Sequence, residues 1–237
     1  MKPQHLTAKP GEVAEKVIVV GDPARARDLA KKLEDAKLVS ENRDLLVFTG
    51  RYKGERVSVA VHGIGGPSAA IVVEELAMLG AKEVVRLGTA GSLKKEIDVK
   101  DAVVVTGAAH YCGGTLGAYA PNACLPTSPD PWLTTKLYEK AREEGLRVHL
   151  GPVISSDAFY AEDPNFAKFW AERGVVAVEM ECATVFALGW MRGLRTGALV
   201  VIADSLVDPG KKDLLHHNEL ADVMERASRA VLEALTS

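Results

Sequence analysis

The chain has 237 residues, of which 47% are hydrophobic and 26% are charged, a balance typical of one folded domain with a substantial core. Its formal net charge of -3 gives no general reason to expect binding to nucleic acid or to an anionic membrane. No apolar run approaches the roughly 20 residues of a membrane span, and residues 1–16 contain no secretory leader, so we expect a cytoplasmic protein.

The first half of the chain alternates β-branched apolar runs with helical patterns. This alternation is typical of a single α/β domain in which helices flank a twisted central sheet, mostly parallel but mixed by a hairpin. The predicted elements are a strand that ends at Gly21, a helix over about 24–33, a hairpin over 45–63, a helix over 67–80, and strands over 83–91 and 101–109.

The second half begins with a long loop from Tyr111 to Pro131 that is rich in Gly, Pro and Asn. Loops of that length are usually functional, so we expect a rim or an interface there. The remaining predicted elements are a helix over 132–145, a strand over 148–154, a helix over 164–173, a strand over 175–180, a helix over 182–191, a strand over 196–204 and an amphipathic helix over 213–235. No linker or repeat interrupts the series, so we expect one domain over residues 1–237.

The three cysteines, Cys112, Cys124 and Cys182, are unevenly spaced, and the six histidines show no metal-ligand spacing. We therefore expect neither a metal site nor a disulfide framework. Cys124 lies in a polar loop, where a free thiol is favoured and a disulfide between subunits is the alternative. Gln and Asn are scarce, which points to a thermophilic source.

Polar or glycine-rich residues follow most of the predicted strands. In open α/β sheets, ligands bind at the carboxyl ends of strands, so we expect these segments to form one site. The segments are Gly21 to Arg25, Arg86 to Gly91, Ser155 to Tyr160, Glu179 to Glu181, and Asp204 with Ser205.

Two of these segments carry arginines. The turn "GDPARAR" places Gly21 before a helix and Arg25 in its first turn, which suits a phosphate, although a plain strand-to-helix turn explains it equally well. Arg86 lies on a buried strand and needs an anionic partner, either a ligand or a structural carboxylate. The "GTAG" that follows is either a nest of backbone N–H groups or a tight turn.

Three carboxylates and an aromatic pair are the other candidates. Asp204 closes an apolar strand, where it is either a general acid with a raised pKa or a cap for the next turn. Glu179 and Glu181 flank an apolar segment, so each needs a partner or an opening of the fold. Phe159 and the neighbouring Tyr160 could stack on a planar ligand, although such a pair more often belongs to the core.

The motifs "GDPARAR", "ENRDLLVFTG", "HGIGGPSAAIVVEEL", "RLGTAGSL", "SSDAFY", "VEMECATVFAL" and "VIADSL", in this order, closely resemble those of the hexameric nucleoside phosphorylases. This family includes purine nucleoside phosphorylases, 5′-methylthioadenosine phosphorylases and uridine phosphorylases. The resemblance implies that phosphate attacks the anomeric carbon of a purine nucleoside, which releases the base and ribose 1-phosphate. It implies no cofactor besides phosphate as co-substrate, and a hexamer that is a trimer of dimers with sites shared across the dimer interface.

The resemblance also implies roles for individual residues. The phosphate would be held by Gly21, Arg25, Arg86 and Thr89, with Arg43 of a neighbouring subunit. The ribose would be bound by Met180 and Glu181, with the neighbour's His5 at the 5′ position. The base would be framed by Ala90, Gly91, Phe159 and Val178. Asp204 would protonate the departing purine. Glu179 is not among the residues that the resemblance assigns, and we expect it to be a structural acid next to the ligand-binding residues.

The resemblance leaves alternatives. Bacterial purine enzymes of this family have an Arg about a dozen residues beyond the catalytic Asp, whereas this chain offers only Lys211, Lys212 and His217. That departure keeps 5′-methylthioadenosine open as the main substrate. Uridine is less favoured because no Gln and Arg pair follows "SSDAFY", and a nucleoside hydrolase is less favoured because water needs no arginine cradle. A binding module without turnover is the alternative outside enzymes.

Overall fold

The computed structural model describes residues 2–161, 163–208, 210, 213–216 and 218–237. Within them the strands are β1 (Lys16–Val20), β2 (Glu34–Ser40), β3 (Val47–Tyr52), β4 (Glu55–Val61), β5 (Glu83–Ser92), β6 (Ala102–His110), β7 (Val148–Ser155), β8 (Ala177–Glu179) and β9 (Arg195–Ser205). The helices are α1 (Pro23–Ala30), the 3-10 turn η1 (Asn42–Asp44), α2 (Gly66–Met78), α3 (Gly114–Tyr119), α4 (Pro131–Glu143), α5 (Phe166–Ala171), α6 (Cys182–Arg192) and α7 (Ala221–Thr236).

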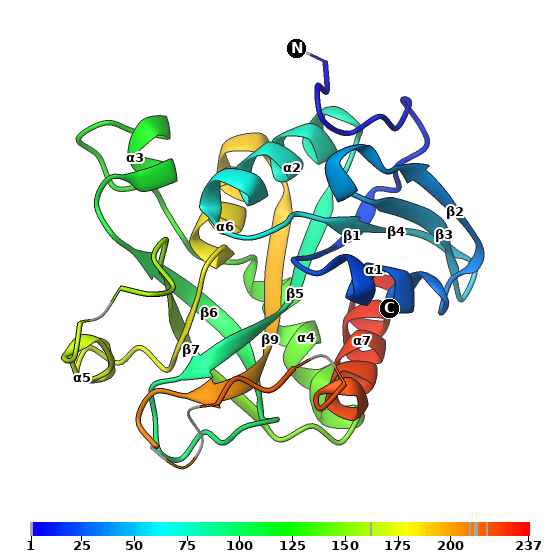
Figure 1. Ribbon diagram of the computed structural model, residues 1–237. Helices are drawn as coiled ribbons and strands as arrows, with labels where there is room; N and C mark the ends of the chain where they lie inside the picture. Colours follow the sequence, from blue (N-terminus) through cyan, green and yellow to red (C-terminus); the bar gives the residue numbers. More distant parts are fainter. Residues whose placement is uncertain (1, 162, 209, 211–212, 217) are drawn as a thin grey trace.

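All of these strands belong to one mixed sheet with the order β2-β3-β4-β1-β5-β8-β7-β6-β9 (Figure 1). Because β9 also pairs with β5, strands β5 to β9 close into a ring, and β1 to β4 continue from β5 as an open wing. β1 is parallel to β4 and β5, whereas β8 is antiparallel to β5 and β9 is antiparallel to β6. The prediction of a mixed α/β fold is confirmed, and the division into one domain stays a prediction.

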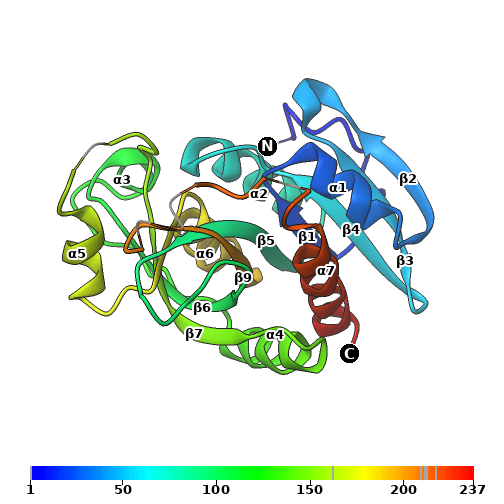
Figure 2. The same ribbon diagram turned by 60° about the horizontal axis from the view of Figure 1, so that its bottom comes forward.

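The helices cover both faces of the sheet, and the alternation of side chains along each strand explains why (Figures 1 and 2). Val17 and Val19 of β1 pack in the cluster that contains the buried residues of α2 and α6. Ile18 and Val20, on the opposite face, pack with α1, α4 and α7. A strand buried on both faces therefore reads as a continuous apolar run, as predicted for residues before Gly21.

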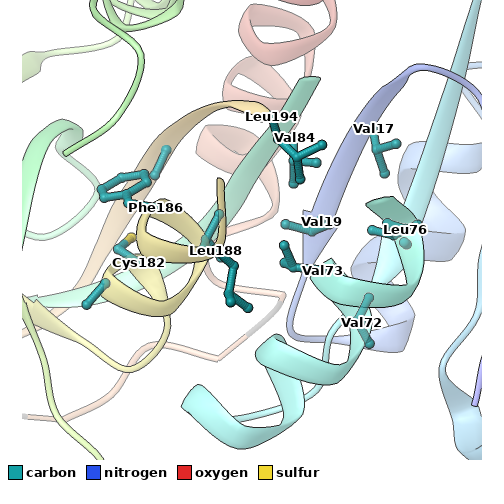
Figure 3. Close-up of a cluster of buried hydrophobic side chains, with 14 of the residues drawn as sticks. Val17, Val19, Val72, Val73, Leu76, Val84, Cys182, Phe186, Leu188 and Leu194 are labelled. Atoms are coloured by element: carbon teal, nitrogen blue, oxygen red, sulfur yellow. The ribbon is translucent and has the colours of Figure 1, made fainter. Parts of the chain in front are cut away.

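The α2 and α6 side of the sheet anchors the elements that carry the candidate site. Figure 3 shows Val72, Val73 and Leu76 of α2 in one cluster with Cys182 and Phe186 of α6. All five side chains are fully buried, and truncation of such a side chain costs about 2–5 kcal/mol. The start of α6 is thus fixed by packing at the residue that follows Glu181.

Four local expectations differ from the structure. β2 was not predicted because it is an edge strand with the charged sequence "EDAKLVS" and an exposed surface. The predicted loop after Tyr111 contains the short helix α3. "GTAG" is not a turn, since it lies inside β5. The last helix begins at Ala221 rather than at residue 213, because the preceding segment runs beside β9, where Leu215 N donates to Ala203 O at 2.9 Å.

Candidate active site

β5 and the chain that leaves β8 form the floor of the candidate site. Val178 lies opposite Gly91 in an antiparallel pair, so the chain beyond Val178 runs back along β5 toward Arg86. This direction brings Glu179 and Glu181 over the middle of β5 rather than beyond its end. The candidate residues of both segments therefore meet, as predicted, but above the strand itself.

Arg86 is the centre of this floor, and its side chain is 4% exposed. Nε donates to Glu179 Oε2 at 3.1 Å, Nη2 pairs with Glu181 Oε2 at 2.5 Å, and Nη1 lies 3.4 Å from Nε2 of His62. Burial alone would lower the pKa of Arg86, but the charges of Glu181 and Glu179 raise it above its ordinary value. A guanidinium carries five N–H groups, so these three interactions leave two for an anion.

Room for this arginine depends on Gly88, two residues along the same strand. A Cβ at position 88 would collide with the guanidinium of Arg86. The guanidinium of Arg86 therefore lies over Gly88 of the same strand, where the absence of a side chain leaves space for it. Nothing larger than glycine fits at position 88 without moving Arg86.

Glu179 is the structural anchor of the floor, and its side chain is fully buried. Besides Arg86, it accepts hydrogen bonds from Ser155 Oγ, from Glu181 N at 2.8 Å and from Cys182 N at 2.9 Å. The last two donors belong to the start of α6, where the helix dipole also favours a negative charge. With both oxygens engaged, Glu179 holds the turn from β8 to α6 and leaves little capacity for a ligand.

Glu181 keeps more hydrogen-bonding capacity. Its Oε1 accepts from Gly65 N at 2.7 Å, and its Oε2 pairs with Arg86, so each oxygen retains a lone pair. Two neighbouring hydroxyl groups, such as those of a ribose, match that remaining capacity. Met180 is half-buried beside it and lines a groove of about 1410 Å³.

A second cation lies beside this floor. Nε of Arg25 is buried and has no hydrogen-bond partner among the residues that the structure describes. Burial lowers the pKa of Arg25 to about 10, with Asp22 opposing and the charge of Arg86 adding to the effect. Arg25 remains charged at neutral pH, and its buried Nε–H, for which no described residue is an acceptor, favours the binding of an anion.

Gly21 and His62 bring the two arginine segments together. A Cβ at position 21 would lie 3.1 Å from Gly63 O and 3.6 Å from Cε1 of His62. Burial and, to a smaller extent, the charge of Arg86 lower the pKa of His62 to about 3, so the ring is neutral and its Nε2 accepts from Arg86. His62 was missed from the sequence because its only signal was its place in the "HGIGG" motif, which identified no role for it.

Asp204 stands at the opposite end of the site. Its Oδ1 lies 3.0 Å from where a Cβ of Gly91 would be, and Val178 borders the same position. Ala90 pairs with Ile202 and Gly91 with Asp204, so Ala203 is the extra residue of a β-bulge. Burial raises the pKa of Asp204, and no cation among the described residues pairs with it.

The other predicted base and phosphate residues differ widely in exposure. Thr89 is half-buried and Ala90 is buried, both on β5. Phe159 and Tyr160 are 63% and 87% exposed, with ring centroids 5.0 Å apart, so the interpretation as core residues is wrong. Lys211, Lys212 and His217 lie outside the described residues.

His5 and Arg43, the residues predicted to reach a neighbouring subunit, lie near each other. Nδ2 of Asn42, the neighbour of Arg43, donates to His5 O at 2.9 Å, so the two candidates share one part of the surface. Both the backbone N–H and the ring of His5 bond to Glu75 near the end of α2, whereas Gly65 just before α2 touches Glu181. Gly65 and Glu75 are separated by about 15 Å along a helix axis, so His5 does not reach the same chain's Glu181.

The cysteines form no disulfide, and the described residues form no metal site. Cys112 and Cys124 are exposed and Cys182 is buried, and all three are free thiols. The described residues contain no group of three or more His, Cys, Asp or Glu side chains that could hold a metal ion. A helix able to cross a membrane is likewise missing from the described part of the chain. The expectation of no cofactor besides phosphate stays a prediction.

A family model and individual relatives agree on the family to which this chain is similar. Residues 15–237 match the phosphorylase superfamily. The chain is 38% identical to a guanosine phosphorylase of Halorubrum lacusprofundi, covering 100% of this chain and 99% of that protein. It is 39% identical to a DeoD-type purine nucleoside phosphorylase of Caldanaerobacter subterraneus subsp. tengcongensis, covering 86% and 88%.

Solved structures show the same fold. A purine nucleoside phosphorylase from Toxoplasma gondii in complex with immucillin-H has a TM-score of 0.89 and 28% identity, covering 99% of this chain and 95% of that one. A uridine phosphorylase from Vibrio fischeri ES114 has a TM-score of 0.87 and 26% identity, covering 99% and 97%. Both likenesses extend over nearly the whole chain.

Proposed function

This chain belongs to the phosphorylase superfamily, and from that premise we propose that it catalyses the phosphorolysis of purine nucleosides to a free purine and ribose 1-phosphate. The protein is accordingly a pentosyltransferase. The observation that carries the proposal is a pair of arginines, the half-buried Arg25 and the buried Arg86, beside a carboxylate with free acceptor capacity. Relatives named for guanosine and purine nucleosides favour this activity over 5′-methylthioadenosine or uridine phosphorolysis.

The phosphate would bind between Arg25, Arg86 and the turn at Gly21. Arg25 has no hydrogen-bond acceptor for its buried Nε–H among the described residues, and Arg86 retains two N–H groups. A bound anion would accept hydrogen bonds from both arginines. Fixing the nucleophile in this way replaces a bimolecular encounter by an oriented attack on C1′. A hydrolase would have no use for two cations under the ribose, which argues against that alternative.

Glu181 would accept hydrogen bonds from the 2′- and 3′-hydroxyls, with Met180 packed against the sugar. As a phosphate oxygen forms its bond to C1′, the bond from C1′ to the base nitrogen breaks, and its electron pair moves onto the purine. Asp204 would give a proton to N7, so that the base leaves neutral. The raised pKa of Asp204 supports this role because it favours the protonated carboxyl.

We further propose that two copies complete each other's sites. Ile64, Ile71 and Met78 recur every seven residues, are 76%, 37% and 41% exposed, and line the groove beside α2. An apolar stripe of this spacing suits pairing with another helix. If two α2 helices pack antiparallel about a twofold axis, His5 of one copy comes close to Glu181 of the other.

The finer properties remain proposals that rest on the family resemblance and on composition. These are the assembly of three such dimers into a hexamer, the contribution of Arg43 to a neighbour's phosphate site, the cytoplasmic location and the thermophilic source. A gel-filtration mass of a monomer would contradict the shared site, because it would leave His5 and Arg43 without a role.

The test of the proposed function is a phosphate-dependence panel. Purified protein is assayed with inosine, guanosine, adenosine, 5′-methylthioadenosine and uridine, each with and without phosphate, and ribose 1-phosphate is measured beside the free base. We expect purine release that requires phosphate and yields one ribose 1-phosphate per base. Undiminished base release in phosphate-free buffer would show a hydrolase instead.

A further inference from the structure

One buried carboxylate fastens the N-terminal segment to α2. Glu75, which is 5% exposed, accepts from Gln4 N at 2.9 Å, from His5 N at 3.0 Å, from Leu6 N at 2.6 Å and from Nδ1 of His5 at 2.9 Å. Burial raises the pKa of Glu75, but the donors of Leu6, Gln4 and His5 outweigh burial and hold it below its ordinary value. The carboxylate is therefore ionised at neutral pH.

His5 differs from its neighbours because it gives both its backbone N–H and its ring to the same carboxylate. An ionised carboxylate only accepts hydrogen bonds, so Nδ1 of His5 carries a proton. In the neutral ring, Nε2 is then an acceptor with a free lone pair. No described residue bonds to Nε2, and the ring, 33% exposed, lines the groove of about 1410 Å³.

We propose that Glu75 is a positioning residue that sets the tautomer and the orientation of His5, so that Nε2 faces the 5′ position of a nucleoside in a second copy. This inference rests on the proposed function and its shared site. It names the substrate class, because a 5′-hydroxyl donates to Nε2 whereas a 5′-deoxy or 5′-methylthio position offers no donor. Sites built to bond a hydroxyl discriminate strongly against analogues that lack it.

The competing interpretation is that Glu75 only anchors the chain terminus. The two roles differ in what they do to a pair of substrates that differ only at the 5′ position. Loss of an anchor lowers the turnover of both substrates in parallel. Loss of the oriented acceptor lowers only the turnover of the substrate that carries the 5′-hydroxyl.

The experiment measures kcat/KM for inosine and for 5′-deoxyinosine at saturating phosphate. It compares the wild type, Glu75→Gln, His5→Ala and the double variant. Nδ1 of His5 shares Oε1 of Glu75 with the backbone N–H groups of Gln4 and His5, whereas Leu6 N bonds to Oε2. A Gln amide has one oxygen for these donors, and its NH₂ group can instead donate to a deprotonated Nδ1, so the tautomer of His5 is no longer enforced. We expect the wild type to prefer inosine by about tenfold or more, each single variant to bring that ratio near one, and the double variant to lower it no further.

A matched control is Glu74→Gln, because Glu74 is the adjacent carboxylate of α2 and pairs with Arg192 rather than with His5. Its inosine preference should equal that of the wild type. If Glu75→Gln does not fold by circular dichroism, Glu75→Asp keeps the charge, shortens its reach and should also lower the ratio.

Parallel losses for both substrates, or a wild-type ratio near one, would overturn the inference and leave the proposed function standing. Absence of phosphate-dependent turnover of inosine by the wild type would overturn the proposed function and, with it, this inference.

Discussion

At the ribose and phosphate end of the candidate site the charged groups pair with one another, whereas at the base end no described residue forms an ion pair with the ionisable group. Arg86 faces Glu179, Glu181 and His62 within a floor that is almost closed to solvent. Asp204 has no cation partner among the described residues, and Phe159, a predicted base-binding residue, is mostly exposed.

The contrast follows from what each end must do. A cradle for an anion and a diol works best when its donors and acceptors are fixed before the ligand arrives, and mutual pairing fixes them. A general acid needs the opposite environment, because a neighbouring cation would lower its pKa and remove its proton. The ribose and phosphate end is thus organised by ion pairs, whereas the base end keeps its acid away from the described cations.

Removal of Glu179 tests the paired end and should have the largest effect. In Glu179→Ala the buried guanidinium of Arg86 loses one of its two carboxylates, and the N–H groups of Glu181 and Cys182 lose their acceptor. We expect the free energy of unfolding to fall by about 3–5 kcal/mol in urea titrations.

A suitable control for that experiment is Glu172→Ala, which breaks an exposed pair with Lys168 and should cost less than about 1 kcal/mol. Equal stability losses in the two variants would show that the buried pairing does not organise the floor.

Removal of the isolated carboxyl tests the base end. Asp204→Asn should lower kcat on purine nucleosides about 100-fold or more, because no proton is then supplied to the leaving base. Thermal stability should not fall, since the raised pKa means that ionisation of Asp204 is less favourable in the folded state than in the unfolded chain.

The same group sets the sign of the pH dependence. The carboxyl is active while protonated, so kcat should decrease as the pH rises through the raised pKa of Asp204. Asp163→Asn, in an exposed loop, is the control and should keep the wild-type profile. An unchanged kcat in Asp204→Asn would remove this residue from the mechanism.

The sequence predicted the elements of the paired end better than their contacts. The buried strand around Arg86 and the acids near residue 180 were visible as polar residues in apolar runs, and the need of each for a partner was a physical deduction. That they are each other's partners required the antiparallel pairing of β8 with β5, for which no local pattern exists.

Contacts between segments that are distant in the sequence could not be predicted from the sequence either. Gly65 N donates to Glu181 across 116 positions of the sequence, and a glycine in "HGIGG" carries no sign of its acceptor. The bulge at Ala203, which sets Asp204 opposite Gly91, is likewise a product of strand register. The sequence therefore identified which side chains need a partner, whereas the strand order and register determine which residues are those partners.

The exposed aromatic pair gives the smallest and most selective test of the comparison. Phe159→Ala should raise KM for purine nucleosides a few-fold, since loss of a stacking ring costs about 1 kcal/mol, and should leave KM for phosphate unchanged. Because Phe159 is 63% exposed, the melting temperature should stay within about 1 °C of the wild type.

Tyr160→Ala, one residue along and 87% exposed, is the matched control and should change neither KM. A lower melting temperature in Phe159→Ala would show that this ring packs in the core. A raised KM for phosphate would show that the two ends of the site are coupled rather than independent.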